Sequence, residues 1–125
     1  MTARLALVIA AAAMFLAVAL GAFGAHALRD RLAPDMAAVW QTAVQYHAWH
    51  ALGLLGVGIL LLQWPERGLL GIAGWLFAAG IILFSGSLYA LALTGMRGLG
   101  AVTPIGGVAF LLGWIVVAVA CFNRG

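Results

Sequence analysis

The chain has 125 residues, of which 66% are hydrophobic and 7% are charged, with a net charge of +3. Ordinary soluble domains are about 45–50% apolar and about 25% charged, and nine charged side chains cannot cover the surface of a soluble domain this small. The composition therefore excludes a soluble globular domain and a disordered chain. The single cysteine excludes an internal disulfide framework.

Four stretches without any charge divide the chain, at 5–28, 36–65, 68–96 and 98–123. Each is longer than the about 20 apolar residues that a membrane-spanning helix needs. Because lipid cannot satisfy backbone N–H and C=O groups, the crossings must be helices or a closed barrel. The runs are continuously apolar and lack the alternation of barrel strands. We therefore predict an all-α integral membrane protein that is a single domain of four transmembrane helices.

The first predicted span covers residues 5–27. Arg4, the apolar run and Ala25-His26-Ala27 also look like a secretory signal with a small-residue cleavage site. The apolar run from Leu5 to Ala25 has 21 residues, whereas the apolar part of a signal peptide has about 7–15. The length therefore favours a retained span.

The second predicted span covers residues 46–64. Trp64 suits the membrane interface, and Pro65 cannot continue the helix. Residues 35–45 have apolar side chains at helical spacing, so they form either an interfacial helix or an overhanging first part of this span. Pro34 and Asp35 suit the first turn of a helix, where a missing N–H costs nothing and an anion meets the positive dipole end.

The third and fourth predicted spans cover residues 69–93 and 104–122. Thr103 is expected to cap the fourth span, with Pro104 as its first helical residue. In the third span, a serine bonded to the carbonyl four residues back would bend the helix, and Gly86 would ease that bend. Because the loops are short, the helices are expected to pack antiparallel, up-down-up-down.

The arginines do not decide the orientation in the membrane. Both faces carry three, so the positive-inside comparison is a tie. Only the α-amino group favours a cytoplasmic N-terminus. The charges are also too scattered for a nucleic-acid-binding surface. The first face has Arg4, Arg67 and Arg124, and the second has Arg29, Arg31 and Arg97.

Small residues are expected to hold the bundle together, because apolar side chains gain nothing by leaving lipid for each other. Close packing of two helices therefore depends on residues with small side chains at the contact. The glycines to which we assign this role are Gly21, Gly53, Gly74 and Gly106.

Most polar side chains of the spans are expected at the same membrane face, because the antiparallel topology brings their helix ends together. The opposite half is almost purely apolar. We predict that this polar cluster binds a ligand or partner, and it consists of His26, Tyr46, His47, His50, Ser85, Ser87, Tyr89 and Thr103. Ser85 and Tyr89 share a helix face, whereas Ser87 points nearly opposite.

The histidines are candidate metal ligands. His47 and His50 are three residues apart and can share one face of a helix, and His26 could supply a third nitrogen for a metal or haem. The spans contain no carboxylate to orient the imidazoles. The alternative is that the histidines form hydrogen bonds between helices. No cofactor is therefore expected, and no catalytic residue, since nothing would orient a Ser–His pair.

Several motifs resemble the YgdD-like family. They are Gly21-Ala22-Phe23-Gly24-Ala25-His26, Thr42-Ala43-Val44-Gln45-Tyr46-His47, Phe84-Ser85-Gly86-Ser87-Leu88-Tyr89, and Thr103-Pro104-Ile105-Gly106-Gly107 with Gly113-Trp114. The resemblance covers nearly the whole chain. It implies a small four-helix protein of a bacterial inner membrane, from a family of unknown function without established catalytic residues.

The favoured functional hypothesis is a non-enzymatic membrane module. Its polar cluster would bind a membrane lipid, a small amphiphile, a membrane protein partner or another copy of the chain. The residues expected to be exposed beside this cluster are Arg29, Arg31, Trp40 and Trp49. The first alternative is a metal or redox-cofactor site at the histidines, and the second is a small-solute conduit formed by an oligomer. The spans carry no charged residue of the kind that ion-coupled carriers use.

Overall fold

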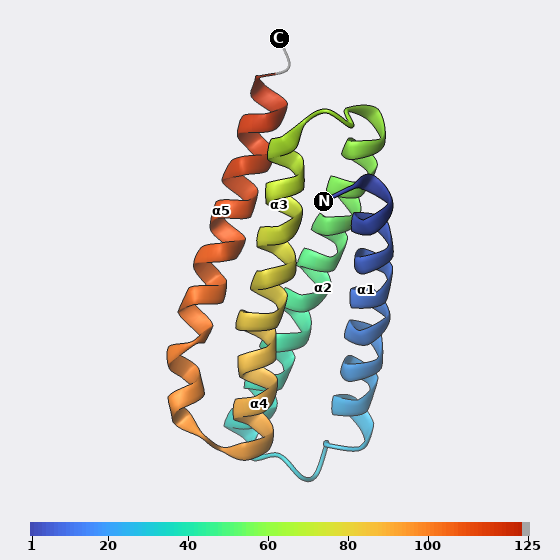
Figure 1. The fold of residues 1–125 in the computed structure, drawn as a ribbon. Coiled ribbons are helices and arrows are strands. Elements are labelled where there is room, and N and C mark those ends of the chain that lie inside the picture. Colours follow the sequence, from blue (N-terminus) through green and yellow to red (C-terminus); the bar gives the residue numbers. More distant parts are fainter. Residues whose placement is uncertain (124–125) are drawn as a thin grey trace.

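A computed structural model describes residues 1–123 as a bundle of four long antiparallel helical rods (Figure 1). The third rod continues through a π-helical turn, η1, and a short 3₁₀-helix, η2, precedes the fourth. All four rods are long and apolar enough to cross a membrane. The elements are α1 (Ala3–His26), α2 (Pro34–Gln63), α3 (Gly68–Gly80), η1 (Ile81–Ser85), α4 (Gly86–Thr94), η2 (Arg97–Ala101) and α5 (Thr103–Phe122).

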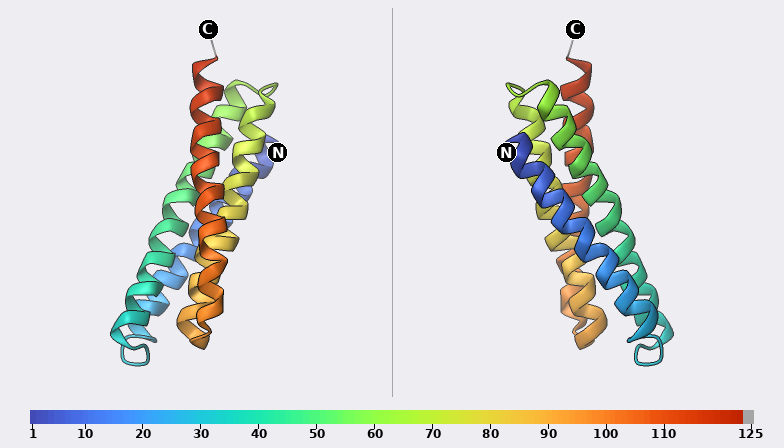
Figure 2. Two further views of the ribbon diagram at one scale, coloured as in Figure 1. Left: turned by 90° about the vertical axis from the view of Figure 1, so that its left-hand side faces the viewer. Right: turned by 90° about the vertical axis from the view of Figure 1, so that its right-hand side faces the viewer.

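Helix α2 is the centre of the packing, because it contacts α1, α3, η1 and α4. Helix α5 lies against α3 and η1 on the other side of the bundle (Figures 1 and 2). The connections 27–33 and 95–102 lie together at one end, which we call the first-loop end. The predicted up-down-up-down topology is confirmed.

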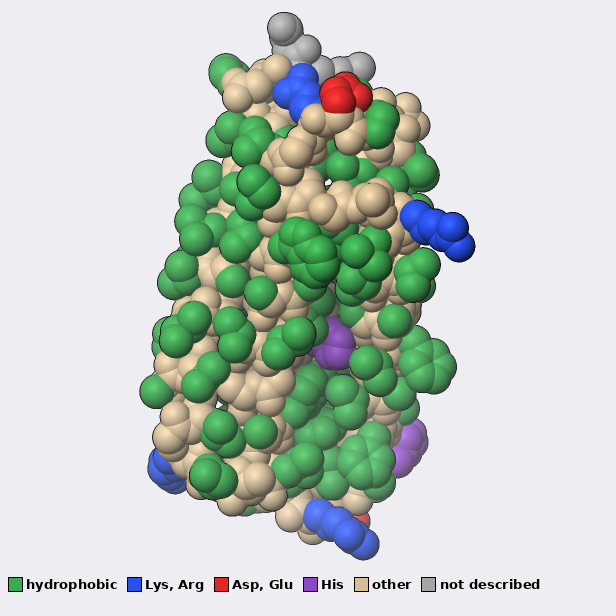
Figure 3. Space-filling view, in the orientation of Figure 1, with side chains coloured by type: hydrophobic (Ala, Val, Ile, Leu, Met, Phe, Trp, Pro, Cys, Tyr) green, Lys and Arg blue, Asp and Glu red, His purple; other side chains and the backbone are tan. Residues whose placement is uncertain are grey.

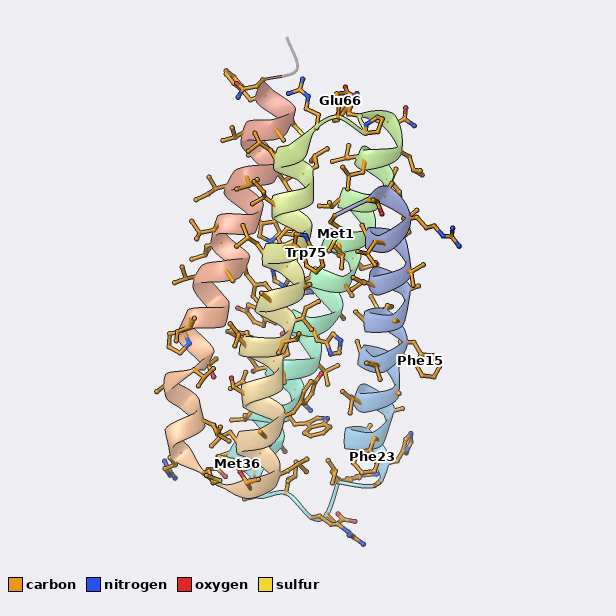
Figure 4. The ribbon with its side chains drawn as sticks, viewed as in Figure 1. Met1, Phe15, Phe23, Met36, Glu66 and Trp75 are labelled. Atoms are coloured by element: carbon orange, nitrogen blue, oxygen red, sulfur yellow. The ribbon has the colours of Figure 1, made fainter. Side chains whose placement is uncertain are left out.

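The face of the bundle seen in Figure 3 is largely apolar along the rods, with basic side chains toward both ends. Phe15 points away from the bundle on α1 and is 73% exposed (Figure 4). The buried core is narrow and contains Leu54, Leu70 and Phe77 among small residues. Lipid is the environment in which such an exposed apolar surface is stable.

Helix α2 is a single helix of 30 residues that begins at Pro34. Residues 35–45 are therefore its first part and not a separate interfacial helix. This changes the expected depth of two histidines, because His47 and His50 lie at the middle of α2 and not at its beginning.

The helix ends use fewer side-chain caps than the sequence suggested. Thr103 is the first residue of α5 and not its N-cap, which is Val102. Gly95 ends α4 in the left-handed region, at φ 70°, which glycine adopts without steric cost. At the opposite end, the Arg67 guanidinium donates to the Ala120 and Asn123 carbonyls and so holds the end of α5.

The four glycines assigned to packing lie where a Cβ would meet a neighbouring element. A Cβ on Gly21 would be 3.2 Å from Val44, and one on Gly53 would be 3.2 Å from the Trp114 ring. At Gly74 the neighbours are Met1 and Leu54, and at Gly106 the backbone of Phe84.

Candidate functional site

The hydrogen bonds between the side chains of one helix and another helix lie between the first-loop end and the middle of the bundle. The Tyr89 hydroxyl and His47 Nδ1 are 2.9 Å apart, so they join α4 to α2. The Ser85 hydroxyl donates to the Ala43 carbonyl at 2.8 Å. These groups lie inside the bundle, and no buried side-chain nitrogen or oxygen of the described residues lacks a partner.

The two serines face different helices, as the spacing predicts. Ser85 and Tyr89 both bond to α2, whereas the Ser87 hydroxyl lies 2.6 Å from that of Thr103 on α5. The Ser87 hydroxyl also reaches the Phe84 carbonyl, three residues back. The expected bond to the carbonyl four residues back does not form, and the irregularity in this rod is the π-helical turn at residues 81–85.

His50 is fixed in one uncharged tautomer by its two partners. Its Nδ1 is 2.7 Å from the Tyr46 carbonyl, which only accepts, so Nδ1 carries the hydrogen. Its Nε2 accepts from the indole N–H of Trp114 at 3.1 Å, and this requires an unprotonated nitrogen. The ring also stacks on Phe110, with centroids 3.5 Å apart. Both nitrogens are therefore already used by the protein.

The histidines do not come together as a three-ligand group. His26 ends α1 as an exposed residue at the first-loop end, whereas His47 and His50 are buried at the middle of α2. Within residues 1–123, no three His, Cys, Asp or Glu side chains are placed to hold one metal ion. Neither buried histidine bonds to a serine in this part of the chain, since His47 is paired with Tyr89 and His50 with Tyr46 and Trp114.

Trp40 is buried, in contrast to the exposed position expected from the sequence. It is 4% exposed, and its indole N–H donates to the Leu20 carbonyl of α1 at 2.9 Å. The ring packs on the backbone of Gly24, where a Cβ would collide with it, and lies 4.8 Å from the Tyr89 ring. This indole is a structural link between α1, α2 and α4.

A groove of about 650 Å³ opens between α1 and α2 at the first-loop end. Its volume is within the range of small-molecule sites, about 300–1,000 Å³. Arg29 is the one charged residue among those that line it. We call it the α1–α2 groove, and its lining consists of Gly21, Gly24, Ala25, Leu28, Arg29, Leu32, Ala37, Trp40, Gln41, Val44 and Gln45.

The α1–α2 groove was missed by reasoning from the sequence. That reasoning selected histidines, serines and tyrosines, most of which form hydrogen bonds inside the bundle, and assigned Gly21 only to packing. The signal was present in two places. Arg29 directly follows the first predicted span, and Gln41 and Gln45 are polar residues one turn apart on α2.

Comparisons with known proteins agree with the architecture. The family model described as a protein of unknown function, DUF423, matches residues 20–107. The UPF0382 membrane protein YwdK of Bacillus subtilis is 53% identical over 105 residues, which cover 84% of this chain and 85% of that protein. A UPF0382 membrane protein of Staphylococcus haemolyticus is 42% identical over 124 residues, 96% and 97% of the two chains. No solved structure matches the chain at a significant level.

These relatives are bacterial proteins named as membrane proteins, and the chain has four helices that can span a membrane. The expectation of an uncharacterised multi-pass membrane family is thereby confirmed. The chain belongs to the DUF423 family of membrane proteins of unknown function.

Proposed function

We propose that the protein is a non-enzymatic module that binds an anionic membrane amphiphile in the α1–α2 groove. The observation that carries this proposal is the composition of the groove, in which a single arginine accompanies a lining of small and apolar residues. A phospholipid has a phosphate that can bind the arginine and acyl chains that can contact the apolar residues.

The polar part of the lining lies near the membrane surface. Arg29 belongs to the connection between α1 and α2, and Gln41 is within the first turns of α2. A guanidinium binds phosphate oxygens through charge-assisted, often bidentate, hydrogen bonds. Gln41 and Gln45 add amide groups that bind glycerol or headgroup oxygens.

The apolar part of the lining extends toward the interior of the bundle. Ala25 on α1 and Leu28 in the connection line one side, and Ala37 and Val44 on α2 line the other, where Val44 packs against Gly21. An acyl chain is the apolar ligand that the surrounding membrane supplies to this surface. The hydrogen bonds of Trp40 and Tyr89 keep the α2 side in place.

The proposal is tested by filling the groove. The assay is photocrosslinking of a diazirine-bearing phosphatidylglycerol to the protein in nanodiscs, with mapping of the labelled peptides. Ala25→Trp places an indole in the groove, and we expect it to remove labelling of residues 21–45. Ala22→Trp is the control, since Ala22 is also exposed on α1 but does not line the groove.

The contribution of the Arg29 charge is tested separately. Arg29→Gln removes the charged phosphate ligand, and hydrogen bonds to charged groups contribute about 1.5–3 kcal/mol, so labelling should need about ten-fold more lipid or more. Arg31→Gln, a change in the same connection outside the lining, should leave the labelling unchanged. Equal labelling in Ala25→Trp and Ala22→Trp would contradict the proposal.

A further inference from the structure

A second groove lies on the face formed by α2 and α5, apart from the α1–α2 groove. Its volume is about 330 Å³, and its lining is apolar. Two indole rings flank it, Trp49 at 49% exposed and Trp114 at 46% exposed. We call it the α2–α5 groove, and it is lined by Trp49, Leu52, Gly53, Gly56, Val57, Leu60, Trp114 and Val117.

Trp49 has an unusual position for a tryptophan in a membrane protein. It is at the centre of α2, which runs from Pro34 to Gln63, whereas tryptophans favour the interfaces. Its ring lies 5.0 Å from Tyr46, but no described residue accepts a hydrogen bond from its indole N–H. An indole only donates, and hydrocarbon offers it no acceptor.

The protein pairs two of its other indoles, those of Trp40 and Trp114, with glycines. Trp40 packs on Gly24 and donates to a carbonyl of the facing helix. Trp114 packs on Gly53 and donates to His50. A ring over a glycine, with its N–H bonded to the facing helix, therefore occurs twice between helices of this bundle.

The α2–α5 groove contains a ring and a glycine that would form a third such contact, but within one copy the two are not in contact. Trp49 is the ring, and Gly56 is the space, since a Cβ on Gly56 would have nothing within 4 Å. Both belong to one face of α2, about 10 Å apart along the helix axis. One copy cannot bring them together, but two copies can.

Symmetry decides how two copies fit. In a pair with the same orientation, the two-fold axis is perpendicular to the membrane, so Trp49 would face Trp49 at equal depth. In an inverted pair the axis lies in the membrane plane and the two α2 helices run antiparallel. With the axis midway between Trp49 and Gly56, Trp49 of one α2 lies opposite Gly56 of the other, and symmetry makes the contact twice.

The arginine distribution permits insertion both ways up. Arg4 and Arg67 lie toward one end of the bundle and Arg29, Arg31 and Arg97 at the other, and in the sequence Arg124 follows the fourth span, so the count is three against three. Such a tie leaves no arginine bias toward either orientation. We propose that the α2–α5 groove is the interface between two copies of this chain inserted in opposite orientations, with Trp49 of each copy in the glycine notch of the other. This interface does not depend on the proposed function of the α1–α2 groove.

Cross-linking distinguishes the two orientations. Thr42 and Leu60 are 18 residues apart on α2, which is five full turns, so they lie on one line along the helix. In a Cys121→Ser background, differently tagged Thr42→Cys and Leu60→Cys copies are coexpressed and treated with a short bismaleimide. An inverted pair gives the Thr42–Leu60 cross-link, because the two Leu60 positions are far apart. A cross-link between two Leu60→Cys copies, or no cross-link at all, would overturn the proposal.

Two further measurements use the same cross-link. Trp49→Phe keeps the ring and removes the N–H, so the yield should fall about five-fold for the loss of one hydrogen bond. Trp75→Phe is the matched control, since Trp75 is 52% exposed and lines neither groove. An equal yield in the two variants would overturn the assigned role of Trp49.

Arg4→Gln and Arg31→Gln remove one exposed arginine from opposite sides and so bias insertion in opposite directions. Each variant alone should give several-fold less of the Thr42–Leu60 cross-link, and coexpression of one with the other should restore it. An unchanged yield from either variant alone would overturn the inverted pairing.

Discussion

Each buried histidine has its own partners, and these partners determine what the ring contributes. His50 is held between the Tyr46 carbonyl and the Trp114 N–H, so it joins α2 to α5 as a neutral ring. His47 bonds to the Tyr89 hydroxyl and joins α2 to α4. In lipid these bonds contribute to helix association, where apolar contacts alone give little specificity.

The first prediction concerns the Tyr89 hydroxyl. Tyr89→Phe leaves a nitrogen of His47 without its partner in a buried position, so we expect unfolding in detergent to require about 1 kcal/mol less free energy. Tyr46→Phe is the control, because no described residue bonds to its hydroxyl. Equal thermal stability of the two variants would show that the His47–Tyr89 bond contributes nothing.

At the scale of the elements, α5 and η1 approach each other most closely at Gly106. A Cβ there would be 2.7 Å from the Phe84 Cα, and backbone cannot move aside as a flexible side chain can. The π-helical turn places Phe84 at this contact. One residue along, a Cβ on Gly107 would be 3.8 Å from the Phe84 ring, which is an ordinary contact.

The second prediction follows from these adjacent glycines. Gly106→Ala should reduce the free energy of unfolding by about 1–3 kcal/mol, because the added methyl overpacks the contact. Gly107→Ala should be neutral or should stabilise α5 by up to about 1 kcal/mol, since alanine has the higher helix propensity. The measurement is thermal unfolding of both variants in one detergent. A greater loss of stability in Gly107→Ala would refute this packing.

The elements were predictable because charges and prolines mark their ends. Arg4, Pro34, Pro65 and Pro104 lie at or beside the beginning or end of a helical rod. The extension of the second span to Pro34 stayed open because residues 35–45 mix glutamines with apolar residues, and both alternatives show that pattern. The π-helical turn has no sequence signal, since it depends on how Phe84 packs against another helix.

The candidate site was less predictable than the fold. The sequence showed that polar residues such as Ser85 and Thr103 lie in one half of the bundle. It did not show that they find hydrogen-bond partners inside the bundle, because those partners depend on the rotation of each helix about its axis. The α1–α2 groove arises from the separation of two helices. Arg29 lines it because of the path of the connection 27–33.

For the whole molecule, one claim underlies both proposals, namely that lipid surrounds the middle of all four rods and water reaches only their ends. The two grooves are binding surfaces for membrane components only in that environment. Exposed Phe15 on α1, Ile82 in η1 and Leu111 on α5 lie near the middle of their rods. Ala33 and Met96 lie in the connections at the first-loop end.

The most direct test is the depth of these five positions in liposomes, measured by spin labels on single cysteines in a Cys121→Ser background. Collision with oxygen reports lipid, collision with a water-soluble nickel chelate reports water, and neither depends on which way up the chain is inserted. We predict high oxygen and low nickel accessibility at positions 15, 82 and 111, and the reverse at 33 and 96. Nickel accessibility at 15, 82 or 111 equal to that at 33 would contradict the four-crossing architecture.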